Sequence, residues 1–196
     1  MIQGAAEGDQ FGDSVSGAGD VNKDGFSDII VGATRASPNG RYCAGAVYVF
    51  FGRAGGFSTV DLVGFVSSDS TGFMIQGASV GFSLGTSVSG TGDVNGDGCD
   101  DIIVGAFGAG SISQARVGVA YHILGKATGF TTVDLLEFSS SDSTGYIIQG
   151  AAGGDYLGWS VSGAGDVNKD GLADVLVGAS GASPNGRTNA GAVYVV

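Results

Sequence analysis

The sequence predicts an all-β fold, and three features lead to this prediction. The chain of 196 residues holds 39 glycines and only 2 prolines. The glycines lack the three-residue period of a collagen and instead separate short runs of Val, Ile, Ala, Tyr and Phe, which is the pattern of strands joined by tight turns. No segment places apolar residues at a 3.6-residue period, so we expect almost no helix.

A gapless internal repeat of 73 residues organises the chain. The segment SVSGAGDVN at 14–22 returns as SVSGTGDVN at 87–95 and again as SVSGAGDVN at 160–168. Because fixed-period similarity indicates a repeat architecture, we divide the chain by this period. The units are repeat 1 at 1–73, repeat 2 at 74–146 and a partial repeat 3 at 147–196.

Each repeat is expected to form four short antiparallel strands. In repeat 1 these strands are predicted at 12–18, 27–33, 44–52 and 72–78. Four strands per unit of this size are typical of a β-propeller blade. The alternative, a β-solenoid, usually has much shorter coils. The sequence therefore predicts about three propeller blades.

The two ends of the chain are complementary in phase. Residues 2–5 correspond to the fourth strand of a repeat, whereas 191–196 corresponds to a third strand. Propellers usually need roughly four to eight blades and close their ring by completing one blade from both termini. We therefore expect residues 1–5 of the same or another chain to complete repeat 3, and the chain to self-associate, most simply as a dimer.

Composition excludes several classes of partner. The formal net charge is −11, so no basic surface is available to neutralise the phosphates of a nucleic acid. No apolar run approaches the roughly 20 residues of a membrane span, and we expect no membrane insertion. The opening MIQGAAEGDQ lacks the features of a signal peptide, so an export signal would lie outside this segment. The two cysteines, Cys43 and Cys99, occupy different phases of the repeat, and free thiols are the default expectation.

Three acidic loops at the same phase of the repeat carry the most specific pattern. Oxygen donors stand at loop positions 1, 3, 5 and 9, a glycine at position 6 allows a sharp turn, and position 7 would offer its backbone carbonyl. Calcium takes six to eight oxygen ligands, which such a loop can supply. We expect three Ca²⁺ sites, one per repeat. The predicted ligands are Asp20, Asn22, Asp24, Phe26 and Asp28; Asp93, Asn95, Asp97, Cys99 and Asp101; and Asp166, Asn168, Asp170, Leu172 and Asp174.

Other interpretations of these loops fit less well. An EF-hand needs a glutamate at position 12 and flanking helices, but position 12 holds Val31, Val104 or Val177 and the flanks are predicted strands. Magnesium seldom occupies an all-protein oxygen cage. The remaining alternative is a turn whose side chains only cap backbone amides.

The residues around the loops resemble the FG-GAP repeats of integrin α-subunit propellers and their bacterial relatives. Phe11-Gly12 and Gly32-Ala33 flank the first loop, and the later copies carry Leu84-Gly85 with Gly105-Ala106 and Leu157-Gly158 with Gly178-Ala179. The usual proline after Gly-Ala is replaced by Thr34, Phe107 and Ser180. The resemblance covers the whole chain. It implies a propeller, usually of seven blades, with mainly structural calcium between the first two strands of each blade, on the face opposite the usual ligand-binding loops.

We expect no enzyme. His122 is the only histidine, which excludes a credible zinc site, and it is predicted to be a partly exposed strand residue. Trp159 is predicted to be a packing or rim residue, and no Gly-x-Ser-x-Gly segment is present.

The sequence favours an extracellular or cell-surface module for adhesion or recognition of a protein or glycan ligand on a loop face. The alternatives are a lectin-like propeller or accessory domain of a carbohydrate-active or other secreted enzyme, and a self-assembling structural repeat protein.

Overall fold

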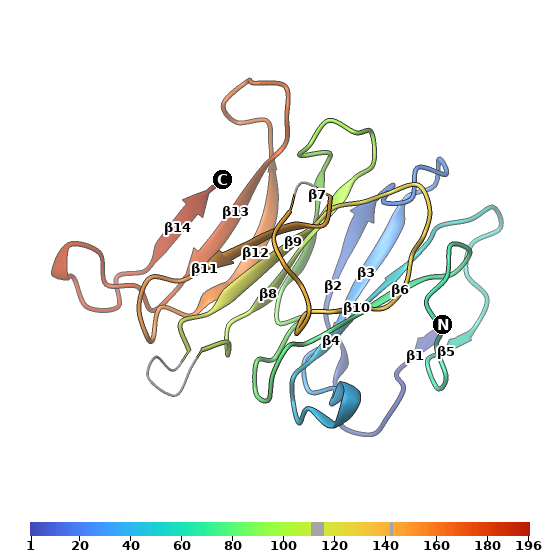
Figure 1. Cartoon of the computed structure of the whole chain (residues 1–196), viewed down its shortest axis with the longest axis horizontal. Coiled ribbons are helices and arrows are strands. Elements are labelled where there is room, and N and C mark those ends of the chain that lie inside the picture. The colour runs from blue at the N-terminus through green and yellow to red at the C-terminus, as the bar shows by residue number, and fades with distance from the viewer. Residues whose placement is uncertain (111–115, 142) are drawn as a thin grey trace.

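The computed structural model describes residues 1–110, 116–141 and 143–196 and confirms an all-β chain. Its elements run side by side along the molecule (Figure 1). In chain order they are β1 Ile2–Gln3, β2 Phe11–Gly19, β3 Asp28–Ala33, the 3₁₀ turn η1 Pro38–Gly40, β4 Ala46–Phe50, β5 Val60–Asp61, β6 Gly72–Gln76, β7 Val88–Gly92, β8 Asp101–Ala106, β9 Val119–Ile123, β10 Val133–Asp134, β11 Gly145–Gln149, β12 Leu157–Gly165, β13 Asp174–Ala179, the 3₁₀ turn η2 Pro184–Gly186 and β14 Ala192–Val195.

These strands form three blades of a β-propeller. Blade 1 is the antiparallel series β2, β3, β4 and β6, blade 2 is β7, β8, β9 and β11, and blade 3 is β12, β13 and β14. The register is the same in successive blades, since Val31 pairs with Tyr48 in blade 1 and Val104 pairs with Tyr121 in blade 2. The predicted strand positions in repeat 1 are therefore confirmed to within a few residues.

The first strands of the blades lie next to one another, β2 beside β7 and β7 beside β12. Beside them, the second strands β3 and β8 approach the backbone of the next blade so closely that a side chain does not fit. A Cβ atom on Gly32 would collide with the carbonyl oxygen of Gly85, and one on Gly105 would collide with that of Gly158. Glycine at these positions is thus required by the contact between blades.

Blades 1 and 2 share one apolar core. Phe130 follows β9 of blade 2 and packs against Phe51 and Phe73 of blade 1, with ring centroids 4.7 Å and 5.0 Å apart. Aromatic pairs at such distances stabilise beyond simple burial of apolar area. The segment after the third strand of blade 2 therefore joins this blade to blade 1.

Part of that joining segment is a strand that sequence analysis missed. The TVDL stretches at 59–62 and 132–135 lie outside the four strands predicted for a repeat, but they contain β5 and β10. Strand β10 pairs in parallel with β6, Val133 opposite Ile75, and β5 pairs in parallel with β1, Val60 opposite Ile2. Two-residue parallel strands have no alternating pattern long enough to be recognised.

The N-terminus lies near one end of the molecule and the C-terminus lies in the other half, next to β14 (Figure 1). Strand β1 pairs with β5, whereas β14 pairs with β13 at the other end. Residues 1–5 therefore do not complete blade 3 of the same chain. Among the described residues, no helix has the length and apolar character needed to cross a bilayer.

Candidate functional site

The three acidic loops are the turns of the first hairpin in each blade. They connect β2 to β3, β7 to β8 and β12 to β13, and they lie along the upper edge of the molecule in Figure 1. The first loop leaves β2 at Gly19 and returns at Asp28, and these two residues are paired. The hairpin thus fixes both ends of the predicted ligand set.

In the first loop, side-chain oxygens point inward and accept backbone hydrogen bonds. Asp20 accepts from the N–H groups of Asp24 at 3.0 Å and Gly25 at 2.9 Å. Asp24 accepts from the N–H of Phe26 at 2.9 Å and from Nδ2 of Asn22 at 2.8 Å. The donors predicted at positions 1, 3 and 5 are therefore brought together by the turn itself.

The second and third loops repeat this arrangement. Asp93 accepts from the N–H groups of Gly96, Asp97 and Gly98 at 2.7–3.1 Å, and Asp166 accepts from those of Asp170 and Gly171. The same asparagine-to-aspartate bond is present in both, from Asn95 to Asp97 and from Asn168 to Asp170, at 2.9 Å each. At position 7, Cys99 and Leu172 donate their N–H groups to Asp97 and Asp170.

Position 6 of each loop has a backbone conformation that favours glycine. The φ angles of Gly25, Gly98 and Gly171 are 88°, 83° and 95°. These values lie in the left-handed region, where a Cβ atom is strained. The glycine in the sequence pattern is thus explained by the turn.

The aspartate at position 9 has a second role that sequence analysis missed. Oδ2 of Asp28 accepts from the N–H of Val21 and Oδ1 accepts from the N–H of Gly52, both at 2.8 Å. Asp101 binds Val94 and Gly125 in the same way, at 2.9 Å and 2.7 Å. Each carboxylate therefore ties its loop to the end of the third strand. The sequence feature that accompanies this bond is the glycine after the third strand, which is Gly52 in repeat 1 and Gly125 in repeat 2.

Burial and neighbouring carboxylates change the acidity of these aspartates. Burial raises the pKa of Asp28 to about 6, two backbone hydrogen bonds oppose the rise, and the charges of Asp24 and Asp20 add to it. The pKa of Asp101 is raised to about 6 by the same causes, with Asp97 and Asp93 as the charged neighbours. Three carboxylates of one loop are thus close enough to repel one another.

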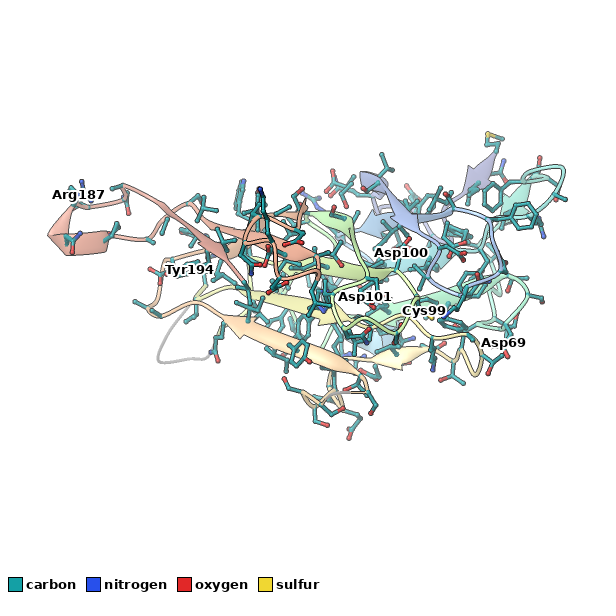
Figure 2. All side chains as sticks on the ribbon, turned by 90° about the horizontal axis from the view of Figure 1, so that it is seen from above. Asp69, Cys99, Asp100, Asp101, Arg187 and Tyr194 are labelled. Carbon is teal, nitrogen blue, oxygen red and sulfur yellow. The ribbon has the colours of Figure 1, made fainter. Side chains whose placement is uncertain are left out.

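The first two loops are bound to each other through Asp100, which sequence analysis did not single out. Its Oδ2 accepts from the N–H of Asp20 at 2.7 Å, and Lys23 Nζ donates to the carbonyl oxygen of Asp97 at 2.8 Å. Asp100 lies beside Cys99 and Asp101 (Figure 2). The equivalent residue in repeat 3 is Ala173, whose N–H donates to Asp93 O at 3.3 Å.

The donor set fits a calcium ion by its chemistry. Within the described residues, no group of three His, Cys, Asp or Glu side chains is arranged ready to hold a metal. The loop carboxylates accept backbone hydrogen bonds instead. Each carboxylate oxygen of Asp20 and Asp24 accepts one hydrogen bond and keeps a second lone pair, whereas Oδ1 of Asp93 accepts two. The carboxylate, amide and carbonyl oxygens of the loops are the hard donors that calcium prefers. Burial is the main cause of the raised pKa of Asp28, and calcium would offset the smaller contribution from the charges of Asp24 and Asp20.

His122, Trp159 and the two cysteines lie in different environments. His122 is buried, with 3% of its surface exposed, so the expected partial exposure is wrong. It contacts Thr91 Oγ1 through Nε2 at 3.1 Å, and burial lowers its pKa to about 4. Trp159 packs against Phe107 with ring centroids 4.7 Å apart while half of it stays exposed, as expected of a rim residue. Both cysteines are free.

Repeated four-stranded blades with matching hairpin loops define a repeat-built β-propeller protein. The family model named FG-GAP repeat matches residues 11–50, 84–122 and 157–196, which together are more than half of the chain. The chain belongs to the FG-GAP repeat family.

Curated relatives match over a small part of their own length. Phosphatidylinositol-glycan-specific phospholipase D of Bos taurus is 31% identical over 168 residues, covering 86% of this chain and 18% of the relative. Integrin alpha-3 of Cricetulus griseus is 31% identical over 180 residues, covering 91% of this chain and 15% of the relative. Integrin alpha-IIb of Mus musculus is 35% identical over 107 residues, covering 55% and 9%. The chain thus spans less than a fifth of each.

Proposed function

We propose that the chain is a calcium-stabilised propeller module of an extracellular or cell-surface protein, and that it recognises a protein ligand. The observation that carries the proposal is the threefold repetition of one loop geometry in a family that includes integrin α relatives. No catalytic role is proposed for this segment, because its single histidine is buried and its carboxylates accept structural hydrogen bonds.

Calcium would act mainly as a structural ion. In the first loop, Asp20, Asn22, Asp24 and Asp28 would hold it with their side chains, and Phe26 with its carbonyl oxygen. The loop is tied to the third strand through Asp28 and to the next blade through Asp100. An ion bound there would stiffen the hairpin and the junction between blades 1 and 2 by removing the repulsion among carboxylates.

The protein ligand would bind at the opposite ends of the strands. Trp159 stands near the start of β12, whereas the acidic loop follows its end at Gly165. Phe107 comes directly after β8, whose first residue Asp101 belongs to the acidic loop. With Tyr156, these residues form an aromatic cluster whose ring centroids lie 4.7–6.3 Å apart. Half-exposed aromatic residues are frequent anchors in protein interfaces.

The same cluster supports glycan binding as a second candidate function, because an exposed indole ring offers a sugar an apolar face with a polar edge. Binding of the chain to immobilised glycans and to immobilised extracellular-matrix proteins, each compared with a Trp159→Ala variant, separates the two. If only glycans bind, and Trp159→Ala weakens that binding, glycan recognition is favoured. If the substitution leaves binding to either class unchanged, the aromatic cluster is not part of the binding site.

Calorimetric titration with CaCl₂, after the chain has been treated with a chelator and the chelator removed, tests the proposal of three calcium sites. We expect three sites in the wild type and two in Asp24→Ala, whose substitution removes the central carboxylate of the first loop. Glu7→Ala, an exposed acid outside the loops, is the matched control and should keep three. If the heat of calcium binding and the number of sites are the same in the wild type and in Asp24→Ala, the assignment of the first site is wrong.

A further inference from the structure

The second acidic loop holds the first through one side chain placed between two of its own predicted ligands. Asp100 lies between Cys99 and Asp101 (Figure 2) and is half-buried. Its Oδ2 accepts from the N–H of Asp20 at 2.7 Å, and its own N–H donates to the carbonyl oxygen of Asp20 at 3.0 Å. The backbone of the first ligand of loop 1 is therefore clamped on both sides by a residue of loop 2.

The first loop returns the contact through Lys23. This residue lies between the predicted ligands Asn22 and Asp24, and its Nζ donates to the carbonyl oxygen of Asp97 in the second loop at 2.8 Å. Lys23 is exposed, and a long side chain loses conformational freedom when it is held, so we expect it to contribute less than Asp100. Each loop thus sends one side chain to a ligand residue of the other.

The junction between the second and third loops lacks both side chains. Ala173 stands at the loop position of Asp100, and Gly96 stands at that of Lys23. Of the three hydrogen bonds between the first two loops, one has a counterpart among the described residues here, from the N–H of Ala173 to the carbonyl oxygen of Asp93 at 3.3 Å. The chain therefore contains a bridged and an unbridged pair of otherwise matching loops.

We propose that the first and second calcium sites are coupled, so that filling either one raises the affinity of the other, whereas the second and third sites are filled independently. The inference rests on the calcium sites proposed above. An ion held by the carbonyl oxygen of Cys99 and the carboxylate of Asp101 restricts Asp100 between them, and Asp100 in turn orders Asp20. The second ion then meets a loop whose ordering cost is already partly covered, and linkage makes the effect reciprocal.

Repulsion between two bound cations opposes this coupling. Salt screens charges that lie more than about 8 Å apart at physiological ionic strength. Because the three loops occupy the same position in successive blades, the repulsion acts at both junctions, and the difference between the junctions isolates the side-chain bridges. We expect coupling of at least about fivefold between the first and second sites, and none between the second and third.

Calorimetric titration with CaCl₂ of chains that keep one or two sites measures the coupling. Asp170→Ala keeps the first and second sites, Asp24→Ala keeps the second and third, and pairwise combinations with Asp97→Ala supply the one-site chains. The product of the two association constants in Asp170→Ala should exceed the product from the one-site chains at least about fivefold, with no excess in Asp24→Ala. No excess in Asp170→Ala, or the same excess in both, would overturn the proposal.

Removal of the bridge should abolish the excess. Asp100→Ala and Lys23→Ala are added together to Asp170→Ala and to the matching one-site chains. Circular dichroism should stay unchanged, because the packing of Phe130 against blade 1 remains. Ser27→Ala with Lys169→Ala, at the same two positions of other loops, is the matched control and should keep the excess. An excess that survives loss of the bridge would overturn the role of these side chains.

Transfer of the bridge to the next junction is the converse test. Ala173→Asp with Gly96→Lys, added to Asp24→Ala and to its one-site chains, should couple the second and third sites. A Cβ atom on Gly92, which corresponds to Gly19, would come no closer to Ala173 Cβ than 3.4 Å. Lysine is tolerated at the other substituted position, since Lys23 has a φ of 58° where Gly96 has 77°. Sites that stay uncoupled would contradict the proposed bridge.

The same titrations separate this inference from the calcium proposal on which it rests. A wild-type chain that binds no calcium would overturn both. Three calcium sites whose affinities are independent would overturn the coupling alone and leave the proposed calcium-stabilised module in place.

Discussion

Asp20 and Asp100 bind each other in both directions. The N–H of Asp20 donates to Oδ2 of Asp100 at 2.7 Å, and the N–H of Asp100 donates to the carbonyl oxygen of Asp20 at 3.0 Å. The pair joins two loops from different blades. Since Ser27 and Ala173 occupy the position of Asp100 in the other repeats, the carboxylate bridge belongs to the junction between blades 1 and 2.

Removing that bridge should destabilise the chain moderately. Asp100→Ala deletes a charged acceptor that is half-buried, and we expect the free energy of unfolding to fall by about 1–2 kcal/mol. Urea unfolding measures the change. Ser27→Ala at the same loop position is the control and should stay within about 0.5 kcal/mol of the wild type. Equal effects of the two substitutions would show that the bridge contributes nothing.

The buried aspartates should matter more than the exposed ones, even without calcium. Asp28→Ala leaves the N–H groups of Val21 and Gly52 without an acceptor in a buried region. Each orphaned donor costs about 1–3 kcal/mol, so unfolding in chelator should be easier by roughly 3 kcal/mol or more. Glu7→Ala, an exposed acid outside the loops, should have no measurable effect. If Asp28→Ala leaves the free energy of unfolding unchanged, the structural role of this carboxylate is refuted.

His122 should make stability depend on pH. Its pKa falls from 6.5 to about 4 on folding because it is buried. Between these values the unfolded chain binds more protons than the folded chain, so the free energy of unfolding rises as the pH rises through this window. The stability gained in this way is lost again as the pH falls from 6.5 to about 4. The full contribution is at most about 3 kcal/mol.

The matched variant for this test is His122→Val, because Val49 and Val195 occupy the same position in the other repeats. Relative to the variant, the wild type should lose stability between pH 6.5 and pH 4 in denaturant titrations. The raised pKa values of Asp28 and Asp101 act in the opposite direction, but they are present in both proteins and cancel. Parallel pH profiles would contradict the buried neutral imidazole.

The two thiols should differ in reactivity. Cys99 is buried, and burial with the nearby charge of Asp97 raises the pKa of its thiol to about 11. Because the thiolate is the reactive species, Cys99 should resist a disulfide reagent at pH 8 in the folded chain, whereas half-buried Cys43 should react. Titration should count one thiol in buffer and two in denaturant. Two thiols reacting at equal rates in buffer would be the contrary result.

The repeat period predicted much of this molecule. The strands and acidic loops followed from local patterns of glycine, apolar alternation and aspartate spacing, each of which depends on nearby residues. The second role of Asp28 did not follow, because its partner Gly52 comes after a different strand, β4, and is recognisable only once β3 and β4 are paired. The burial of His122 was missed for a related reason, since Thr91 reaches it only across the sheet of blade 2.

The contact of Gly32 with the backbone of Gly85 has a consequence for how freely the rest of the chain can vary. Where peptide groups touch directly, the angular pitch from one blade to the next is set by backbone geometry rather than by the volume of side chains. Phe130 or Val49 can then change size and repack locally without rotating the neighbouring unit. An array built on such contacts keeps a constant pitch as its repeats diverge, and whole units can be gained or lost without rebuilding the remainder.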